Sequence, residues 1–157
     1  MRGRGRDRSP RRGPAAPETL FLRIDGASRG NPGAAGFGVA VEDSEGASIA
    51  SLYGFLGTAS NNVAEYQALI HALDYAIANG ARHVEIFSDS QLVVRQVQGQ
   101  YRVKHPAMVP LHREARALLG RLERASLHHV PREENRAADR LANQAVDERD
   151  SNYERSV

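Results

Sequence analysis

The chain contains no cysteine, which excludes disulfide scaffolds, zinc-thiolate sites and thiol nucleophiles. Any metal ion that binds must therefore be held by oxygen or imidazole ligands. No apolar run approaches the roughly 20 residues that span a bilayer, and the basic start is not followed by the apolar segment of a signal peptide. These absences predict a cytoplasmic protein without a membrane partner.

The composition is that of one folded domain. With 157 residues, of which 41% are hydrophobic and 25% charged, the chain can bury a single core. Its charge is uneven, because residues 1–12 hold six Arg and one Asp and therefore a net charge of +5. Since the whole chain has a net charge of +2, residues 13–157 carry −3. We expect a disordered Arg/Gly-rich arm over 1–18, a folded domain over 19–148 and a flexible tail over 149–157. Such an arm either contacts nucleic-acid backbones or is a passive, solvated or cloning-derived segment.

The spacing of apolar residues predicts an α/β protein with the element order βββαβααβα. Short links between the first three strands favour an antiparallel meander. We expect strands at 20–25, 36–43, 47–57, 83–89 and 125–130, and helices at 61–80, 90–99, 105–123 and 135–148.

Parallel strands need right-handed crossovers, which places the first, fourth and fifth strands side by side and the meander at the other edge. The result is a five-stranded mixed sheet of order 3-2-1-4-5, with strands 1 to 3 antiparallel and helices on both faces. In such sheets the ligand site lies beyond the carboxyl ends of the parallel strands. Asp25 and Asp89 are both expected at such ends.

Two further acids fall one turn into predicted helices, Glu65 and Asp139. Taken singly, each acid is more simply explained as a cap, and the glycines after Asp25 as a hairpin turn. Together, four carboxylates without a matching cluster of basic residues would repel one another and raise one another's pKa, and divalent cations would relieve that repulsion. Glycines that let a ligand backbone approach closely complete a pattern that favours a two-metal nuclease or phosphatase.

Four motifs resemble, in order and spacing, those of type 1 ribonuclease H: "DGASRGNPG", "NNVAEYQAL", "SDSQLVVRQ" and "HVPREENRAADRLAN". The match covers about Leu20–Asp147 and is most similar to the short subtype with an "HVPRE" segment. The resemblance implies the ribonuclease H-like fold and endonucleolytic cleavage of the RNA strand of RNA/DNA hybrids, which leaves 5′-phosphate and 3′-hydroxyl ends. It also implies that two Mg²⁺ ions, or Mn²⁺ as a substitute, are held by Asp25, Glu65, Asp89 and Asp139.

The same resemblance implies residues that contact the substrate, since only the 2′-hydroxyl distinguishes ribose from deoxyribose. Asn61 and Asn62 are equally explained as the start of a helix, whereas nothing structural demands Gln91. Ser60 matches a position near the phosphate pocket of the DNA strand. The expected substrate-binding residues are Gly26, Ser28, Asn31, Ser60, Asn61, Asn62 and Gln91, with the first two in a turn.

Two features depart from the family pattern. Many members carry a mobile His before the last acid that helps product leave, and His129 takes that place; yet "SLHHVP" is typical of a strand, so a structural role is equally expected. Arg132, on the next loop and always charged, is the alternative. At 100–111 larger members have a basic, Trp-containing protrusion, whereas this chain has no Trp and a single Lys. Weaker substrate binding follows unless the arginine arm compensates.

Two other functions can be weighed against the sequence. A non-catalytic module that binds hybrids or RNA would lack one of the four acids, and all four are present. A relative on the same fold would cut other duplexes; Asn61, Asn62 and Gln91 favour ribose recognition, which leaves double-stranded RNA as a second substrate. We expect a monomer whose main partner is an RNA/DNA hybrid.

Overall fold

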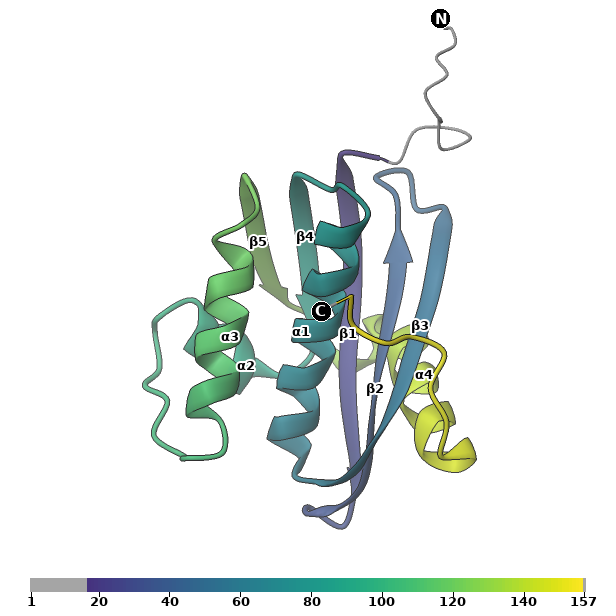
Figure 1. Cartoon of the computed structure of the whole chain (residues 1–157), viewed down its shortest axis with the longest axis vertical. Helices are drawn as coiled ribbons and strands as arrows, with labels where there is room; N and C mark the ends of the chain where they lie inside the picture. Colours follow the sequence, from purple (N-terminus) through teal and green to yellow (C-terminus); the bar gives the residue numbers. More distant parts are fainter. Residues whose placement is uncertain (1–16, 157) are drawn as a thin grey trace, which may run out of the picture.

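The computed structural model describes residues 17–156, so nearly all of the predicted arm lies outside the described residues. Within this range, four α-helices flank one five-stranded sheet (Figure 1). The strands are β1 (Thr19–Arg29), β2 (Gly33–Glu42), β3 (Ser48–Ala59), β4 (His83–Ser88) and β5 (Arg124–His129). The helices are α1 (Asn61–Ala78), α2 (Gln91–Val97), α3 (Val109–Leu119) and α4 (Arg136–Glu148), with a 3-10 turn η2 (Arg132–Glu134) before α4.

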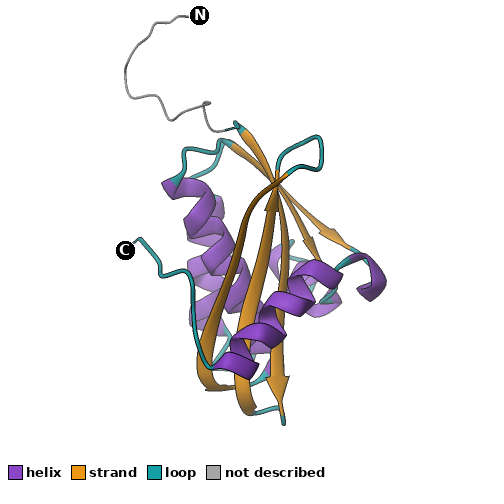
Figure 2. Cartoon of the chain, turned by 90° about the vertical axis from the view of Figure 1, so that its right-hand side faces the viewer, coloured by secondary structure: helices purple, strands orange, loops and turns teal. Residues whose placement is uncertain are grey.

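The sheet has the order β3-β2-β1-β4-β5, as the sequence predicts. β1 pairs antiparallel with β2 and parallel with β4, and β4 pairs parallel with β5. α1 and α3 lie on one face of the sheet, and α4 crosses the other (Figures 1 and 2). The predicted α/β architecture with helices on both faces is therefore confirmed. Among residues 17–156, no helix combines the length and apolarity needed to cross a bilayer.

Alternation of side chains along the strands produces the core. In β1 up to Ile24, and throughout β4, every second residue is buried, including Leu22, Ile24 and Ile86, and these pack against the apolar side of α1. Buried Tyr66 donates its hydroxyl to Gln96 Oε1 at 2.7 Å and so joins α1 to α2. The core therefore fixes α1, which carries Glu65, and α2, which follows Asp89.

β1 is longer than predicted. Gly26–Arg29 pair with β2 and continue the strand past Asp25, because the antiparallel partner extends beyond the end of β4. The prediction of a turn at Gly26–Ser28 is therefore wrong, and the reversal lies between β1 and β2, at Gly30–Pro32. The parallel pairing of β1 with β4 ends at Ile24 and Ser88. Asp25 and Asp89 still come directly after the residues that pair β1 with β4, although Asp25 is inside β1 and not at its end.

The segment after α4, where the sequence analysis expects a flexible tail, makes hydrogen bonds with β3 and α1. It runs from α4 past the edge of β3 to α1 (Figures 1 and 2). Asn152 makes three hydrogen bonds with the backbone of Ser51 and Tyr53. Tyr153 donates its hydroxyl to Asp74 of α1. We call Ser151–Ser156 the C-terminal strap.

Candidate active site

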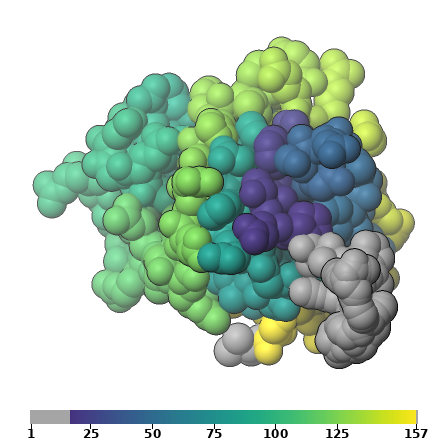
Figure 3. All heavy atoms as spheres, turned by 90° about the horizontal axis from the view of Figure 1, so that it is seen from above, coloured from purple at the N-terminus to yellow at the C-terminus, as the bar shows by residue number. Residues whose placement is uncertain are grey.

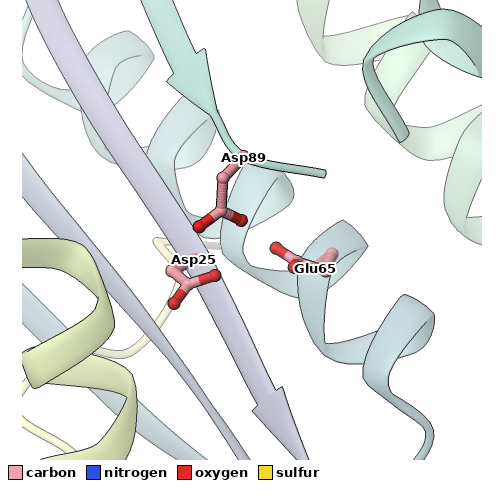
Figure 4. Close-up of side chains that lie close together, drawn as sticks. All are labelled: Asp25, Glu65 and Asp89. Atoms are coloured by element: carbon pink, nitrogen blue, oxygen red, sulfur yellow. The ribbon is translucent and has the colours of Figure 1, made fainter. Parts of the chain in front are cut away.

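Three carboxylates meet beyond the paired ends of β1 and β4. Asp25 comes from β1, Glu65 from the first part of α1 and Asp89 from the residue after β4, and they point toward one another (Figure 4). One carboxylate oxygen from each lies within 4.8 Å of those of the other two. The sequence pattern thus brings together residues that are 64 positions apart.

Local structure fixes each of these acids. Ser60 caps α1 by accepting the N–H of Val63 at 3.2 Å, which sets the direction of the turn that carries Glu65. Gly26 donates its backbone N–H to Glu65 Oε1 at 3.0 Å. A Cβ at this glycine would overlap backbone atoms of Ala64 and Glu65, so only glycine lets α1 come this close to β1.

Asp89 is held between two serines. Ser90 donates its N–H to the hydroxyl of Ser88 at 3.0 Å, and its own hydroxyl accepts the N–H of Val93 at 3.2 Å to begin α2. Buried Asn135 donates to the carbonyl of Ile24 at 2.8 Å, and its side chain lowers the pKa of Asp89. This asparagine therefore ties the start of α4 to the backbone of β1, next to Asp25.

The acids are electrostatically strained without a cation. Burial, with the charges of Asp89 and Asp139, raises the pKa of Asp25 to about 8. Burial, with Asp25 and Asp89, raises the pKa of Glu65 well above its usual value. Burial also raises the pKa of Asp89, an effect that Arg132 and Asn135 oppose. Desolvation and like charge both disfavour the ionised forms, as expected for a cluster that requires a positive partner.

The donor set fits divalent cations. It consists of carboxylate oxygens, the ligands that Mg²⁺ and Mn²⁺ favour, and no thiol competes for the site because the chain has no cysteine. Asp25 and Glu65 are buried while Asp89 is half-buried, so the cluster is open on one side to a ligand. Divalent cations would remove the repulsion that raises these pKa values.

The fourth acid stands slightly apart. Asp139, near the start of α4, is outside the group of three whose oxygens lie within 4.8 Å, but it lines the same cleft of about 440 Å³. Its charge also contributes to the raised pKa of Asp25. The structure therefore brings all four predicted acids to one cleft, with three of them in close contact.

The other predicted residues divide into two groups. Gly26, Ser28, Asn61, His129 and Arg132 line the cleft with the acids. The remaining predicted residues, which lie outside this lining, are Asn31, Ser60, Asn62 and Gln91.

Residues outside the lining still support it. Asn31 accepts the backbone N–H of Asn61 on its side-chain oxygen at 2.9 Å, which fixes the start of α1 beside the β1–β2 turn. Ser60 is the cap of the same helix. Gln91 is the exposed first residue of α2.

The two candidates for product release both face Asp89. His129 ends β5, in agreement with the strand pattern around it. Arg132 belongs to η2 and not to an irregular loop as expected, because the segment "REE" closes one 3-10 turn before α4. The positive charges of Arg132 and of protonated His129 lower the pKa of Asp89. Either residue is therefore close enough to interact with a group bound at the acids.

Sequence reasoning missed several residues of the cleft, among them Arg29 and Asn143. It also missed the buried Asn135, which it treated only as the start of the last helix. Asparagine within a helical motif and arginine beside a glycine-rich segment are usually surface residues, so neither gave a signal. Only the crossing of α4 over β1 and β2 brings them to the site.

Comparison with known proteins identifies the family of this chain. Residues 23–145 match the model of the reverse transcriptase-like family. The chain is 43% identical over 125 residues to ribonuclease HI of Halobacterium salinarum, covering 80% of this chain and 63% of that protein. The crystal structure of RNase H1 from that archaeon superposes with a TM-score of 0.81 at 41% identity, over 83% of this chain and 98% of the other. The chain belongs to the type 1 ribonuclease H family.

Further relatives agree with this assignment. The bifunctional protein Rv2228c of Mycobacterium tuberculosis is 44% identical over 129 residues. The alignment covers 82% of this chain but only 35% of that longer protein. The solved N-terminal RNase H domain of Rv2228c superposes with a TM-score of 0.80 at 43% identity, over 83% of this chain and 94% of the other. LC11-RNase H1, isolated from compost and solved in complex with an RNA/DNA hybrid, superposes with a TM-score of 0.78 at 37% identity, over 83% and 98%.

One part of the surface is formed by the segment at 100–111, which the sequence analysis singled out. The link between α2 and α3 stands out at the left of the molecule (Figures 1 and 3). Beside it lies a pocket of about 570 Å³ to which Arg102, Arg113 and Arg116 contribute. Among the described residues that line this pocket there is no carboxylate. The link and the adjoining part of α3 therefore present positive charge at this pocket.

Proposed function

We propose that the chain is an endoribonuclease that hydrolyses the RNA strand of RNA/DNA hybrids. The observation that carries this proposal is the cluster of Asp25, Glu65 and Asp89, with Asp139 in the same cleft, at the paired ends of β1 and β4. It is supported by membership of the ribonuclease H family and by the likeness to LC11-RNase H1, which was solved with an RNA/DNA hybrid.

In this proposal the four acids hold two Mg²⁺ ions, with Mn²⁺ as a substitute. Such ions, when bound, activate water for in-line attack on the phosphodiester and stabilise the leaving oxygen, so that the products carry 5′-phosphate and 3′-hydroxyl ends. The protein fixes the ligands: Gly26 holds Glu65 by a hydrogen bond, and Asn135 holds the backbone beside Asp25. Arg132 lies where its charge can attract the phosphate before cleavage and release it afterwards; His129 is the other candidate for release.

Recognition of ribose would occur beside the acids. Ser28 and Asn61 line the cleft, and Asn31 holds the backbone of Asn61 in place. The hydroxyl of Ser28 donates to the carbonyl of Ala59 at 2.7 Å, so it is left as an acceptor for a 2′-hydroxyl. Gln91, Asn62 and Ser60 would contact the substrate farther from the scissile phosphate. Double-stranded RNA, which offers the same 2′-hydroxyls in a wide minor groove, is a second substrate.

The Arg-lined pocket beside the α2–α3 link would contribute phosphate contacts in place of a longer protrusion. Arg102, Arg113 and Arg116 supply positive charge there, and the arm over 1–12 supplies more. Such contacts dominate the affinity of proteins for nucleic acids and make it dependent on salt. We also propose that the enzyme is monomeric and cytoplasmic and belongs to the short subtype.

The test is to offer one labelled strand as RNA/DNA hybrid, double-stranded RNA or double-stranded DNA, each with Mg²⁺, Mn²⁺ or a chelator. We expect internal cuts in the RNA of the hybrid that require metal, slower cuts in double-stranded RNA, and intact double-stranded DNA. A chain that binds the hybrid but cuts none of the duplexes in either metal would instead be a binding module.

A further inference from the structure

Asp139 is held by a chain of polar contacts that begins on another element. Asn143, one turn further along α4, donates its side-chain N–H to Asp139 Oδ1 at 3.2 Å and to the carbonyl of Asp139 at 3.0 Å. Arg29, at the end of β1, donates to Asn143 Oδ1 at 2.9 Å. The same guanidinium forms an ion pair with Asp147 at 2.7 Å. Arg29 and Asn143 both line the cleft of the acids.

These contacts decide how the amide of Asn143 is turned. An arginine only donates hydrogen bonds, so the atom of Asn143 that faces Arg29 must be the oxygen. The amide nitrogen then points toward Asp139 and donates a hydrogen bond to one of its carboxylate oxygens. Since Asp147 fixes the guanidinium from the other side, Arg29 has its position set by two residues of α4.

We propose that Asn143, oriented by Arg29, is a positioning residue that fixes the carboxylate of Asp139 for binding a divalent cation. This inference rests on the proposed function, in which Asp139 is the fourth acidic ligand. One oxygen of Asp139 is occupied by Asn143, which leaves the other for the cation. Glu65 is held by the N–H of Gly26 and Asp89 by the turn at Ser88–Ser90, whereas Asp139 stands outside the group of three acids and needs a separate support.

The β1–β2 hairpin thereby contacts both helices that carry acids. Arg29 binds α4 through Asn143, and Asn31, two residues later, binds the start of α1 through the N–H of Asn61. A substrate strand that passes over this hairpin would meet a surface joined to Asp139 on one side and to the helix of Glu65 on the other. Loss of Arg29 should therefore act in the same direction as loss of Asn143, but more weakly, because the donor to Asp139 remains.

The first test measures Mn²⁺ binding to the full chain by calorimetry, without substrate. We expect Asn143→Ala to weaken binding by roughly tenfold, as the loss of partners of metal ligands typically does, and Arg29→Ala to weaken it by less. Gln144→Ala is the matched control, since Gln144 lies next to Asn143 on α4 and its side chain, within residues 17–156, hydrogen-bonds only to Glu148. This variant should bind Mn²⁺ as the wild-type chain does. Wild-type affinity in Asn143→Ala would overturn the proposal.

The second test combines Asn143→Ala with Asp139→Ala. If Asn143 acts through Asp139, the first substitution has no further effect on Mn²⁺ affinity once Asp139 is absent; additive losses would contradict this. On the hybrid, Asn143→Ala should raise the Mg²⁺ concentration for half-maximal rate and leave KM within twofold. A raised KM with unchanged Mn²⁺ affinity would assign Asn143 to substrate binding and overturn the positioning role. If the wild-type chain binds Mn²⁺ but cuts no hybrid, the proposed function fails while the calorimetric comparison still decides the role of Asn143.

Discussion

Asp25 is the residue at which burial and function conflict most. It is 5% exposed, it has Asp89 and Asp139 as charged neighbours, and its pKa rises from 3.8 to about 8. An ionised carboxylate in such a place lowers the stability of the fold unless a cation is present. The cost is acceptable in a site that binds metal, because ligands that repel one another bind a divalent cation more tightly.

This conflict predicts how the stability of the metal-free protein depends on pH. Between pH 4 and 8 the folded chain keeps a proton on Asp25 that the unfolded chain has lost, so the free energy of unfolding falls as the pH rises. A shift of even one unit corresponds to about 1.4 kcal/mol. We therefore expect the difference in unfolding free energy between Asp25→Asn and the wild type to grow in favour of the variant by at least about 1 kcal/mol from pH 5 to pH 8. Denaturant titrations in the presence of a chelator would measure this difference.

Saturating Mg²⁺ is the control for this prediction. It should raise the unfolding free energy of the wild-type chain at pH 8 and leave Asp25→Asn nearly unchanged, since the cation replaces the proton. A difference between the two proteins that stays constant from pH 5 to pH 8 in chelator would show that Asp25 is not strained by its surroundings.

The sequence predicted correctly which acids lie close together. Asp25, Glu65 and Asp89 follow from four motifs in order and from the rule for parallel strands, and they do meet. The supporting residues could not be predicted in this way. Asn143 and Arg29 acquire a role only because α4 crosses β1, and no spacing within either segment encodes that contact.

At the scale of elements, the close approach of two helices to the sheet positions the acids. Gly26 faces the backbone of α1 beside Glu65, and Gly38 faces the backbone of α4 at Ala138 and Ala142. A Cβ at either glycine would overlap main-chain atoms of the helix, which cannot move aside like a side chain. Each glycine therefore sets the distance between one acid-bearing helix and β1 or β2.

Substitution of these glycines should separate the helices from the sheet. We expect Gly26→Ala and Gly38→Ala each to lower the free energy of unfolding by about 2 kcal/mol, the usual cost of overpacking, and to lower kcat on the hybrid. Gly120→Ala is the control, because its φ is −67° and a Cβ there meets only ordinary contacts. Urea titration and hybrid cleavage would measure both effects. Wild-type behaviour of Gly26→Ala or Gly38→Ala would show that the neighbouring helix tolerates the added Cβ.

Element types were more predictable than their ends. All nine predicted strands and helices occur in the described range, but β1 runs to Arg29 because β2 continues to pair with it. α3 spans Val109–Leu119 and not 105–123, since Pro110 suits only the first turn of a helix and Gly120 ends it. Pairing partners and tertiary caps set these ends, and a local pattern does not contain them.

At the scale of the whole molecule, the C-terminal strap closes one edge of the sheet. The amide of Asn152 imitates a strand: its nitrogen donates to Ser51 O at 2.8 Å and its oxygen accepts Tyr53 N–H at 2.7 Å. Ser151 accepts the N–H of Phe55 at 2.9 Å. The strap then reaches Asp74, which is buried in α1 and accepts the N–H of Ser156 at 2.9 Å. It thus joins β3 to α1 far from the cleft and satisfies an edge that would otherwise be open to pairing.

A chain that ends at Asp150 tests this description. Loss of the strap removes several hydrogen bonds, each contributing about 1 kcal/mol, and leaves Asp74 buried without these partners, so the free energy of unfolding should fall by roughly 3 kcal/mol. The kcat on the hybrid at a temperature where the chain stays folded should not change, because no residue of the strap lines the cleft. Asn152→Ala should reproduce part of the loss. An unchanged unfolding curve, or a lower kcat in the folded state, would contradict the account.

The most direct test of the central claim compares the wild-type chain with Asp89→Asn on a labelled RNA/DNA hybrid in Mg²⁺. Asp89 is half-buried and open to the cleft, so the variant should keep the fold and bind the hybrid within a few-fold of the wild type while RNA cleavage is lost. That result would identify the acidic cluster as the place of hydrolysis. Cleavage by Asp89→Asn at a rate close to that of the wild type would remove this carboxylate from the mechanism and contradict the assignment of the site.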